Sequence, residues 1–203
     1  MIQSGDKSHI QWSDGNWVFL DIGFSNSARS CGLILGDTAP QCVQFNDAKK
    51  KILERVRDSI STLNLVIEAP LSVCFDSKGN PKGRRIEKSE NKNRYWYIGP
   101  GCTVMVAAMY LIREIYQVGP KVSVRLFEGF ISYKDSSRSS NHKTDVCLLR
   151  EVVWDPIRFS DSIYSADQLK TEETDSLCSA FCVAGFDCGI PVVIKRDVPA
   201  ATI

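Results

Sequence analysis

Two carboxylates stand where strongly apolar segments are expected to end. Asp21 closes the run WVFLD within residues 17–24, and Glu68 closes the run LVIE just before Pro70. A carboxylate in such a place needs a partner, because burying an isolated charge is costly. Backbone N–H groups or an arginine could satisfy each one separately. Alternatively, neighbouring strands would bring both carboxylates to one sheet edge, where a divalent cation relieves their repulsion.

The elements that must position these carboxylates follow from hydrophobic periodicity. Aromatic and β-branched residues predict strands over 17–24, 30–36 and 41–45, joined by short turns as an antiparallel meander. Apolar residues then recur every three or four positions over 47–63, which predicts an amphipathic helix. The wholly apolar run 65–67 predicts a strand covered on both faces.

The downstream order completes an α/β pattern. It predicts a mixed sheet, with a three-strand antiparallel meander plus parallel strands, flanked by helices. The length of 203 residues favours a single domain over 1–203 with its core at about 17–194. The remaining predicted elements are helices over 101–117, 144–154 and 172–187 and strands over 121–127 and 192–194.

This order and several short motifs resemble the RNase-H-like fold. In that fold the first and fourth strands are neighbours, each supplies a metal-binding carboxylate, and a late helix supplies a third. More narrowly, the chain is similar over about residues 17–190 to a predicted RNase-H-like nuclease family catalogued as domain of unknown function number 429. Two departures are Gly129, where members commonly have proline, and Glu68, where they often have Asp. The motifs that carry the resemblance are EAPL at 68–71, GPG at 99–101, LFEGF at 126–130 and DSLCSA at 175–180.

The resemblance implies hydrolysis of phosphodiester bonds by two metal ions, Mg²⁺ or Mn²⁺, about 4 Å apart. Asp21 would bridge both ions, and Glu68 and a helix carboxylate would each complete one. We expect Asp175 to be that third carboxylate, because on a helix over 172–187 it shares a face with small residues that can approach a sheet closely. An arginine partner would also satisfy Asp175, and Asp145 is the alternative metal ligand.

The segment His142-Lys143-Thr144-Asp145 allows two interpretations. Thr144 could cap a helix whose first turn holds Asp145, which the helix dipole favours. Alternatively, Lys143 has a catalytic role or His142 contacts nucleic acid, either one touching the scissile phosphate or assisting proton transfer. Asp145 also heads an apolar stripe, so its side chain could point inward.

Residues 76–94 form a basic insertion that we expect to be a mobile loop. Basic residues beside aromatic ones can hold a phosphate chain and stack on bases, so DNA or RNA is the expected partner. Glu87 and Glu90 favour instead an ordinary solvated loop. The nucleic-acid-binding candidates are Arg84, Arg85, Lys88, Lys92, Arg94 and Trp96, together with His142.

The amino-acid composition limits which cellular compartments and binding partners we expect for this protein. The formal net charge of +1 offers no global basic field for nucleic acid, so any such surface must be local. No apolar run is long enough to span a membrane, and no signal-like segment begins the chain. The eight cysteines lack a CxxC pair, which favours reduced, buried thiols in the cytoplasm. A zinc site at Cys178, Cys182 and Cys188 is the alternative.

Two rival functions follow from the same pattern. A sugar-kinase or actin-like phosphotransferase also has Asp-x-Gly on its first strand, as at 21–23, but it needs two such domains and a second phosphate loop. A non-catalytic module of the same fold, binding nucleic acid or protein within a larger assembly, is the second rival. A protein partner or a homo-oligomer fits either the nuclease or the module.

Overall fold

The computed structural model describes residues 1–24, 30–89, 92–93, 100–132, 142–183, 185 and 188–197. Within these residues, eight strands form one mixed sheet in the order β11-β13-β10-β5-β2-β3-β4, and β1 also pairs with β10. The strands are β1 (Ile2–Ser4), β2 (Asn16–Asp21), β3 (Cys31–Leu35), β4 (Gln41–Val43), β5 (Leu63–Glu68), β10 (Val124–Ser132), β11 (Ile163–Tyr164) and β13 (Val193–Asp197).

The direction of the strands follows the predicted pattern. The strands β2, β3 and β4 are antiparallel neighbours, as expected for the meander. From β2 onward, β5, β10 and β13 run parallel to one another. The α/β class and the mixed sheet are therefore confirmed. The strand β1 was not predicted, and it shares one edge of β10 with β13.

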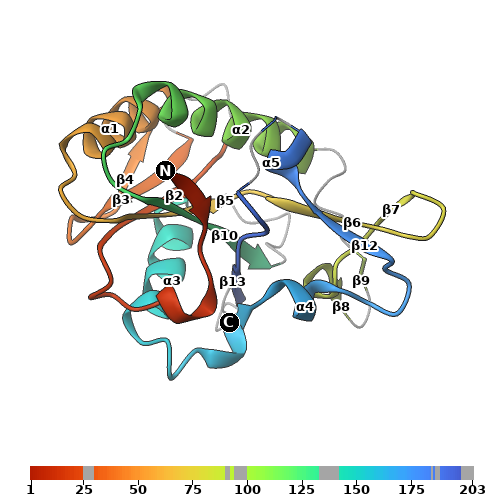
Figure 1. Cartoon of the computed structure of the whole chain (residues 1–203). Helices are drawn as coiled ribbons and strands as arrows, with labels where there is room; N and C mark the ends of the chain where they lie inside the picture. Colours follow the sequence, from red (N-terminus) through yellow and green to blue (C-terminus); the bar gives the residue numbers. More distant parts are fainter. Residues whose placement is uncertain are drawn as a thin grey trace.

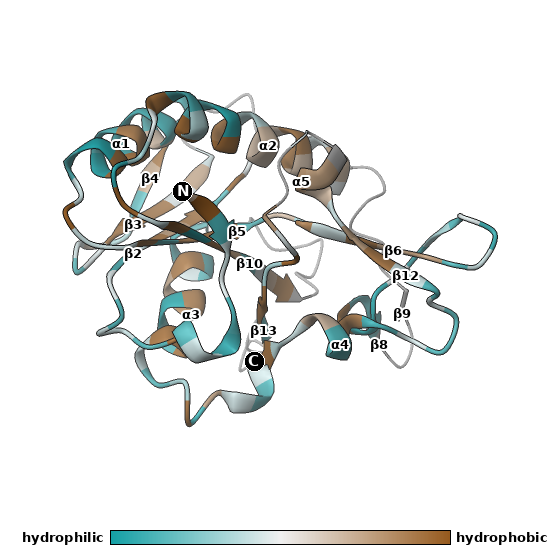
Figure 2. Ribbon diagram, viewed as in Figure 1, coloured by the Kyte–Doolittle hydropathy of each residue, from teal (hydrophilic) through white to brown (hydrophobic). Residues whose placement is uncertain are grey.

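Helices cover both faces of this sheet (Figure 1). The helices α1 (Phe45–Asp58) and α2 (Pro100–Val118) lie on one face, and α3 (His142–Trp154) lies on the other. Side chains alternate along β2, so Val18 and Leu20 join the core under α1 and α2, whereas Trp17 and Phe19 join the core under α3. In Figure 2 the apolar colouring of α3 faces the sheet.

A second, three-stranded sheet projects from the main one. It consists of β6 (Ser72–Phe75), β7 (Pro81–Lys82) and β12 (Ser176–Ser179), all antiparallel. The strands β8 (Lys88–Ser89) and β9 (Lys92–Asn93) pair with each other, and the short helices α4 (Ala166–Leu169) and α5 (Ala180–Val183) flank β12 in the chain.

The helix predicted over 172–187 is therefore wrong. Residues 176–179 form β12 instead, and of the residues that the structure describes in this range only 180–183 are helical. The reason is tertiary: β12 pairs with β6 from Ser176 opposite Phe75 to Ser179 opposite Ser72. This pairing satisfies the backbone groups along β6, and it overrides a local pattern of small and apolar residues that also suits a helix.

The basic insertion is more ordered than expected. Arg84 is fully buried, and it is the second largest of the fully buried side chains. Its guanidinium donates to Glu128 Oε2 at 2.8 Å, to Ser72 Oγ at 2.9 Å and to Glu87 Oε1 at 2.8 Å. Glu128 Oε2 also accepts from the backbone N–H of Leu71 at 2.8 Å. One arginine thus joins the second sheet to β10.

This buried network sets the charge state of its members. Burial opposes the charge of Arg84, but the carboxylates of Glu128 and Glu87 outweigh that effect and raise its pKa above the ordinary value. Burial raises the pKa of Glu87, against the effect of Arg84. The guanidinium is the cation on which both acids depend.

The cysteines divide by exposure. All eight are free thiols, and Cys31, Cys74 and Cys188 are buried as expected, but Cys178 and Cys182 are exposed. Burial raises the pKa of Cys31 and of Cys74. The cysteines form no metal-binding group among the described residues. No helix in the described part of the chain is long and apolar enough to cross a membrane.

Removing the arginine of the buried network should destabilise the protein strongly. We expect Arg84→Ala to lower the free energy of unfolding by about 3–5 kcal/mol, because it leaves two buried carboxylates without their cation. The matched control is Arg85→Ala, which changes the exposed neighbour and should cost less than about 0.5 kcal/mol. Urea unfolding measures both, and equal losses would contradict the network.

Candidate metal centre

The two predicted strand-end carboxylates lie side by side. The strands β2 and β5 are parallel, and Asp21 is the register partner of Glu68. Register partners in neighbouring strands are about 5 Å apart at Cα and project from the same face of the sheet. Asp21 lies two residues beyond Phe19 and Glu68 two beyond Val66, so both carboxylates face α3.

The start of α3 brings two further side chains to this place. His142 Nδ1 lies 2.7 Å from Asp21 Oδ2. Asp145, one helical turn later, is buried. Ligand atoms of Asp21, His142 and Asp145 all lie within 4.8 Å of one another, a spacing at which one cation could contact all three. Glu68 lies outside that group of three but is the register partner of Asp21, and we call the four residues together the carboxylate cluster.

Glycines let α3 approach the sheet so closely. A Cβ on Gly23 would collide with the His142 ring, and a Cβ on Gly32 would collide with the His142 backbone carbonyl. Further along the helix, a Cβ on Gly129 of β10 would lie 2.7 Å from Leu149. The first turn of α3 is therefore held against β2 and β3 by positions that only glycine can fill.

The cluster is enclosed as well as crowded. Asp21 is fully buried, and Glu68 and Asp145 are 7% and 3% exposed. Buried carboxylates this close repel one another unless a proton or a cation compensates them. The imidazole of His142, whose side chain is 16% exposed, contacts Asp21 at 2.7 Å.

The neighbouring thiol is not suited to help. Cys31 lies beside the cluster on β3, and its Sγ is 3.6 Å from the carbonyl oxygen of Gly23, to which it donates. Burial raises the pKa of the Cys31 thiol, and the charge of Asp21 adds to the shift. The ligand atoms that lie together among the described residues are carboxylate oxygens and an imidazole nitrogen, from Asp21, Asp145 and His142.

Asp175 does not join the cluster, which corrects the expected third ligand. It is exposed and precedes β12, where its backbone N–H donates to the carbonyl of Phe75 at 2.9 Å. The physical reason is the strand that replaces the predicted helix there. Asp145 takes the place that we expected for Asp175. Lys143 lies in the first turn of α3 with its side chain exposed.

The predicted nucleic-acid contacts are scattered. Arg84 is wrong as a surface contact, because it is buried against Glu87 and Glu128. Arg85 and Lys88 are exposed, and Lys88 lies 3.7 Å from Glu173. The backbone of Lys92 lies in β9, while Arg94 and Trp96 fall outside the described residues. His142 instead contacts the carboxylate cluster.

The position of His142 beside the buried acids could have been inferred from its spacing to Asp145 in the sequence. Residues three apart on a helix share a face, so a buried Asp145 predicts that His142 faces the same neighbours. The interpretation of Thr144 as a helix cap hid this signal, because it places the first turn of the helix in solvent.

Comparison with known proteins gives no match. No protein family model, no curated protein and no solved structure matches the chain.

Metal binding should depend on Asp145 and not on Asp175. We expect Asp145→Asn to weaken Mn²⁺ binding by at least about 10–100-fold, the range for merely removing a partner of a ligand. Asp175→Asn is the matched control and should leave the affinity within about twofold. Isothermal titration of each variant with Mn²⁺ measures the difference. A larger loss of Mn²⁺ affinity in Asp175→Asn than in Asp145→Asn would show that Asp175 is the third ligand.

Proposed function

We propose that this protein is a nuclease that depends on Mg²⁺ or Mn²⁺ and hydrolyses phosphodiester bonds of DNA or RNA. The observation that carries the proposal is the buried carboxylate cluster at the carboxyl end of β2 and β5. Two buried acids, Asp21 and Asp145, and the imidazole of His142 have ligand atoms within 4.8 Å of one another, and a divalent cation between them would offset the repulsion of the two carboxylates.

The arrangement of strands supports an RNase-H-like assignment. The order β4-β3-β2-β5-β10 places the first meander strand beside the next parallel strand, as that fold requires. The carboxylates sit at the ends of these two central strands, and another comes from a helix later in the chain. The EAPL motif begins at the end of β5, as the resemblance implies, whereas the DSLCSA motif lies largely in β12, and the helix acid is Asp145 of α3.

The donor set fits the proposed ions. Asp21, Glu68 and Asp145 offer the hard oxygen ligands that Mg²⁺ and Mn²⁺ prefer, and an imidazole ligand favours Mn²⁺ over Mg²⁺. Such ions supply an activated water and stabilise charge on the leaving oxygen. His142 orients the carboxylate of Asp21 through its 2.7 Å contact, whether or not its ring also binds metal.

Lys143 is placed to contact a phosphate. It is exposed beside His142, in the first turn of α3, where the helix dipole also favours an anion. The burial of Arg84 moves the proposed nucleic-acid surface away from 76–94 and toward this end of the sheet. The free thiols support a reducing compartment such as the cytoplasm.

Cleavage should require Asp21. We expect the wild-type protein to cut an oligonucleotide only with Mg²⁺ or Mn²⁺ present. Asp21→Asn should lower kcat by about a thousandfold, since metal catalysis contributes several kcal/mol to transition-state stabilisation. Gel analysis of end-labelled DNA and RNA measures the rate.

Asp175→Asn is the matched control here as well, and it should cut at the wild-type rate. Metal binding without any cleavage by the wild type would contradict the nuclease and leave the non-catalytic module of the same fold. Equal cleavage by wild type and Asp21→Asn would show that the activity comes from elsewhere.

A further inference from the structure

We propose that Phe24 is a stacking platform for a base next to the carboxylate cluster, so that the preferred substrate is single-stranded nucleic acid. This inference rests on the proposed nuclease function and names its substrate class. Phe24 is 51% exposed and follows Asp21 by three residues.

The backbone places Phe24 at the rim of the cluster. Asp21 ends β2, and the Cα of Gly23 lies against the His142 ring. The carbonyl of Gly23 accepts from Ser30 Oγ at 2.6 Å and from Cys31 Sγ at 3.6 Å. Phe24 follows directly from this anchored residue.

The ring itself is also held. It meets Phe45, the first residue of α1, edge to face, with 6.2 Å between centroids and 61° between planes. An edge-on neighbour holds an aromatic ring while leaving a face open for stacking. A ring that is ordered in advance loses little side-chain entropy when a base stacks on it.

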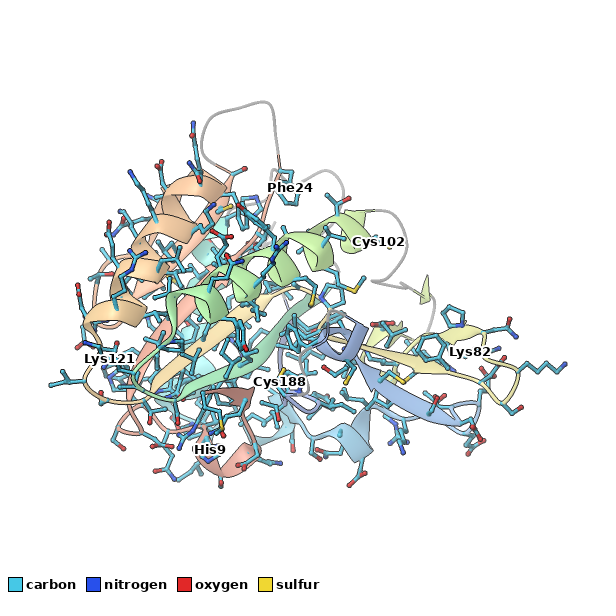
Figure 3. The ribbon with its side chains drawn as sticks, turned by 45° about the horizontal axis from the view of Figure 1, so that its top comes forward. His9, Phe24, Lys82, Cys102, Lys121 and Cys188 are labelled. Carbon is cyan, nitrogen blue, oxygen red and sulfur yellow. The ribbon has the colours of Figure 1, made fainter. Side chains whose placement is uncertain are left out.

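The carboxylate of Asp21 and the ring of Phe24 lie on opposite faces of the sheet, at the same edge. Asp21 faces α3, whereas Phe24 packs toward α1 on the other face. A strand crossing this edge would set one phosphate at the cluster and a neighbouring base over Phe24. Figure 3 shows Phe24 near the end of α2 that carries Cys102, with Lys121 beyond the other end of that helix.

Other exposed aromatic side chains in the described residues do not share this position. The Trp154 ring packs on Trp12 near the end of α3, and Lys49 lies over the ring of Tyr110. Tyr116, 61% exposed, lies near the end of α2, beside a hollow that Met1 and Pro120 also line. Phe24 differs from them because it follows Asp21 by three residues, just beyond the end of β2.

The ligand class follows from what a ring can recognise. A base in a duplex is already stacked on both faces, whereas a base in a single strand is free to stack on an aromatic side chain. Stacking is tolerant of sequence, and the weak overall charge of this chain gives little help from phosphate contacts. The protein should therefore distinguish single strands from duplexes more strongly than it distinguishes one base sequence from another.

The test compares binding by Phe24→Leu and by Phe24→Trp with the wild type. The probes are end-labelled oligothymidylate, oligouridylate and the duplex of oligothymidylate with oligoadenylate, with Ca²⁺ in place of Mg²⁺. We expect Phe24→Leu to weaken single-strand binding by about tenfold, and duplex binding by less than about twofold. Phe24→Trp should keep the wild-type affinity. Fluorescence anisotropy measures each Kd.

The control is Tyr116→Leu, which should bind every probe as the wild type does. Single-strand binding by Phe24→Leu within twofold of the wild type would overturn the proposal, as would equal losses on single strand and duplex. Failure of the wild type to cut any probe in Mg²⁺, with binding still dependent on Phe24, would overturn the nuclease alone. The DNA and RNA arms show which strand is preferred.

Discussion

The parallel pairing of β2 with β5 is the constraint on which the rest of the site depends. It puts Asp21 and Glu68 at the same level of the sheet, on the same face, with their carboxylates at its carboxyl edge. This pairing brings two carboxylates close together, and their repulsion has to be offset by the rest of the site. His142 lies 2.7 Å from Asp21, and Gly23 and Gly32 lack side chains where His142 must pass. Asp145 then adds another acid, and Asp21, His142 and Asp145 together could hold a metal ion.

A second buried network solves a different problem. The chain leaves β5 at Glu68 and must turn at once toward β6 in the second sheet. Glu128 accepts from the N–H of Leu71 in that turn, and Arg84 joins Glu128 to Glu87. Glu128 is the register partner of Ile67, on the face opposite α3, so the network fixes the exit of β5 and supports the position of Glu68. Two charged groups of residues, one on each side of the sheet, thus define this edge.

The parts of this structure that sequence could predict are those set by local pattern. Apolar runs ending in a charge located Asp21 and Glu68, and the resemblance to the RNase-H-like fold implied that their strands are neighbours. Arg84 could not be predicted, because a run of basic residues resembles a solvated loop and its partner Glu128 lies 44 residues away. Asp175 was misplaced because β12 forms only where β6 offers an edge, which no local pattern records.

The most direct test of the metal centre is a crystal structure of the protein with Mn²⁺, recorded at a wavelength where manganese scatters anomalously. The account predicts an anomalous peak between the carboxylates of Asp21 and Asp145, with Glu68 close enough to bind the same ion or a second one. A peak at another place, such as beside Asp175, would contradict it. So would an empty cluster in crystals that hold saturating Mn²⁺.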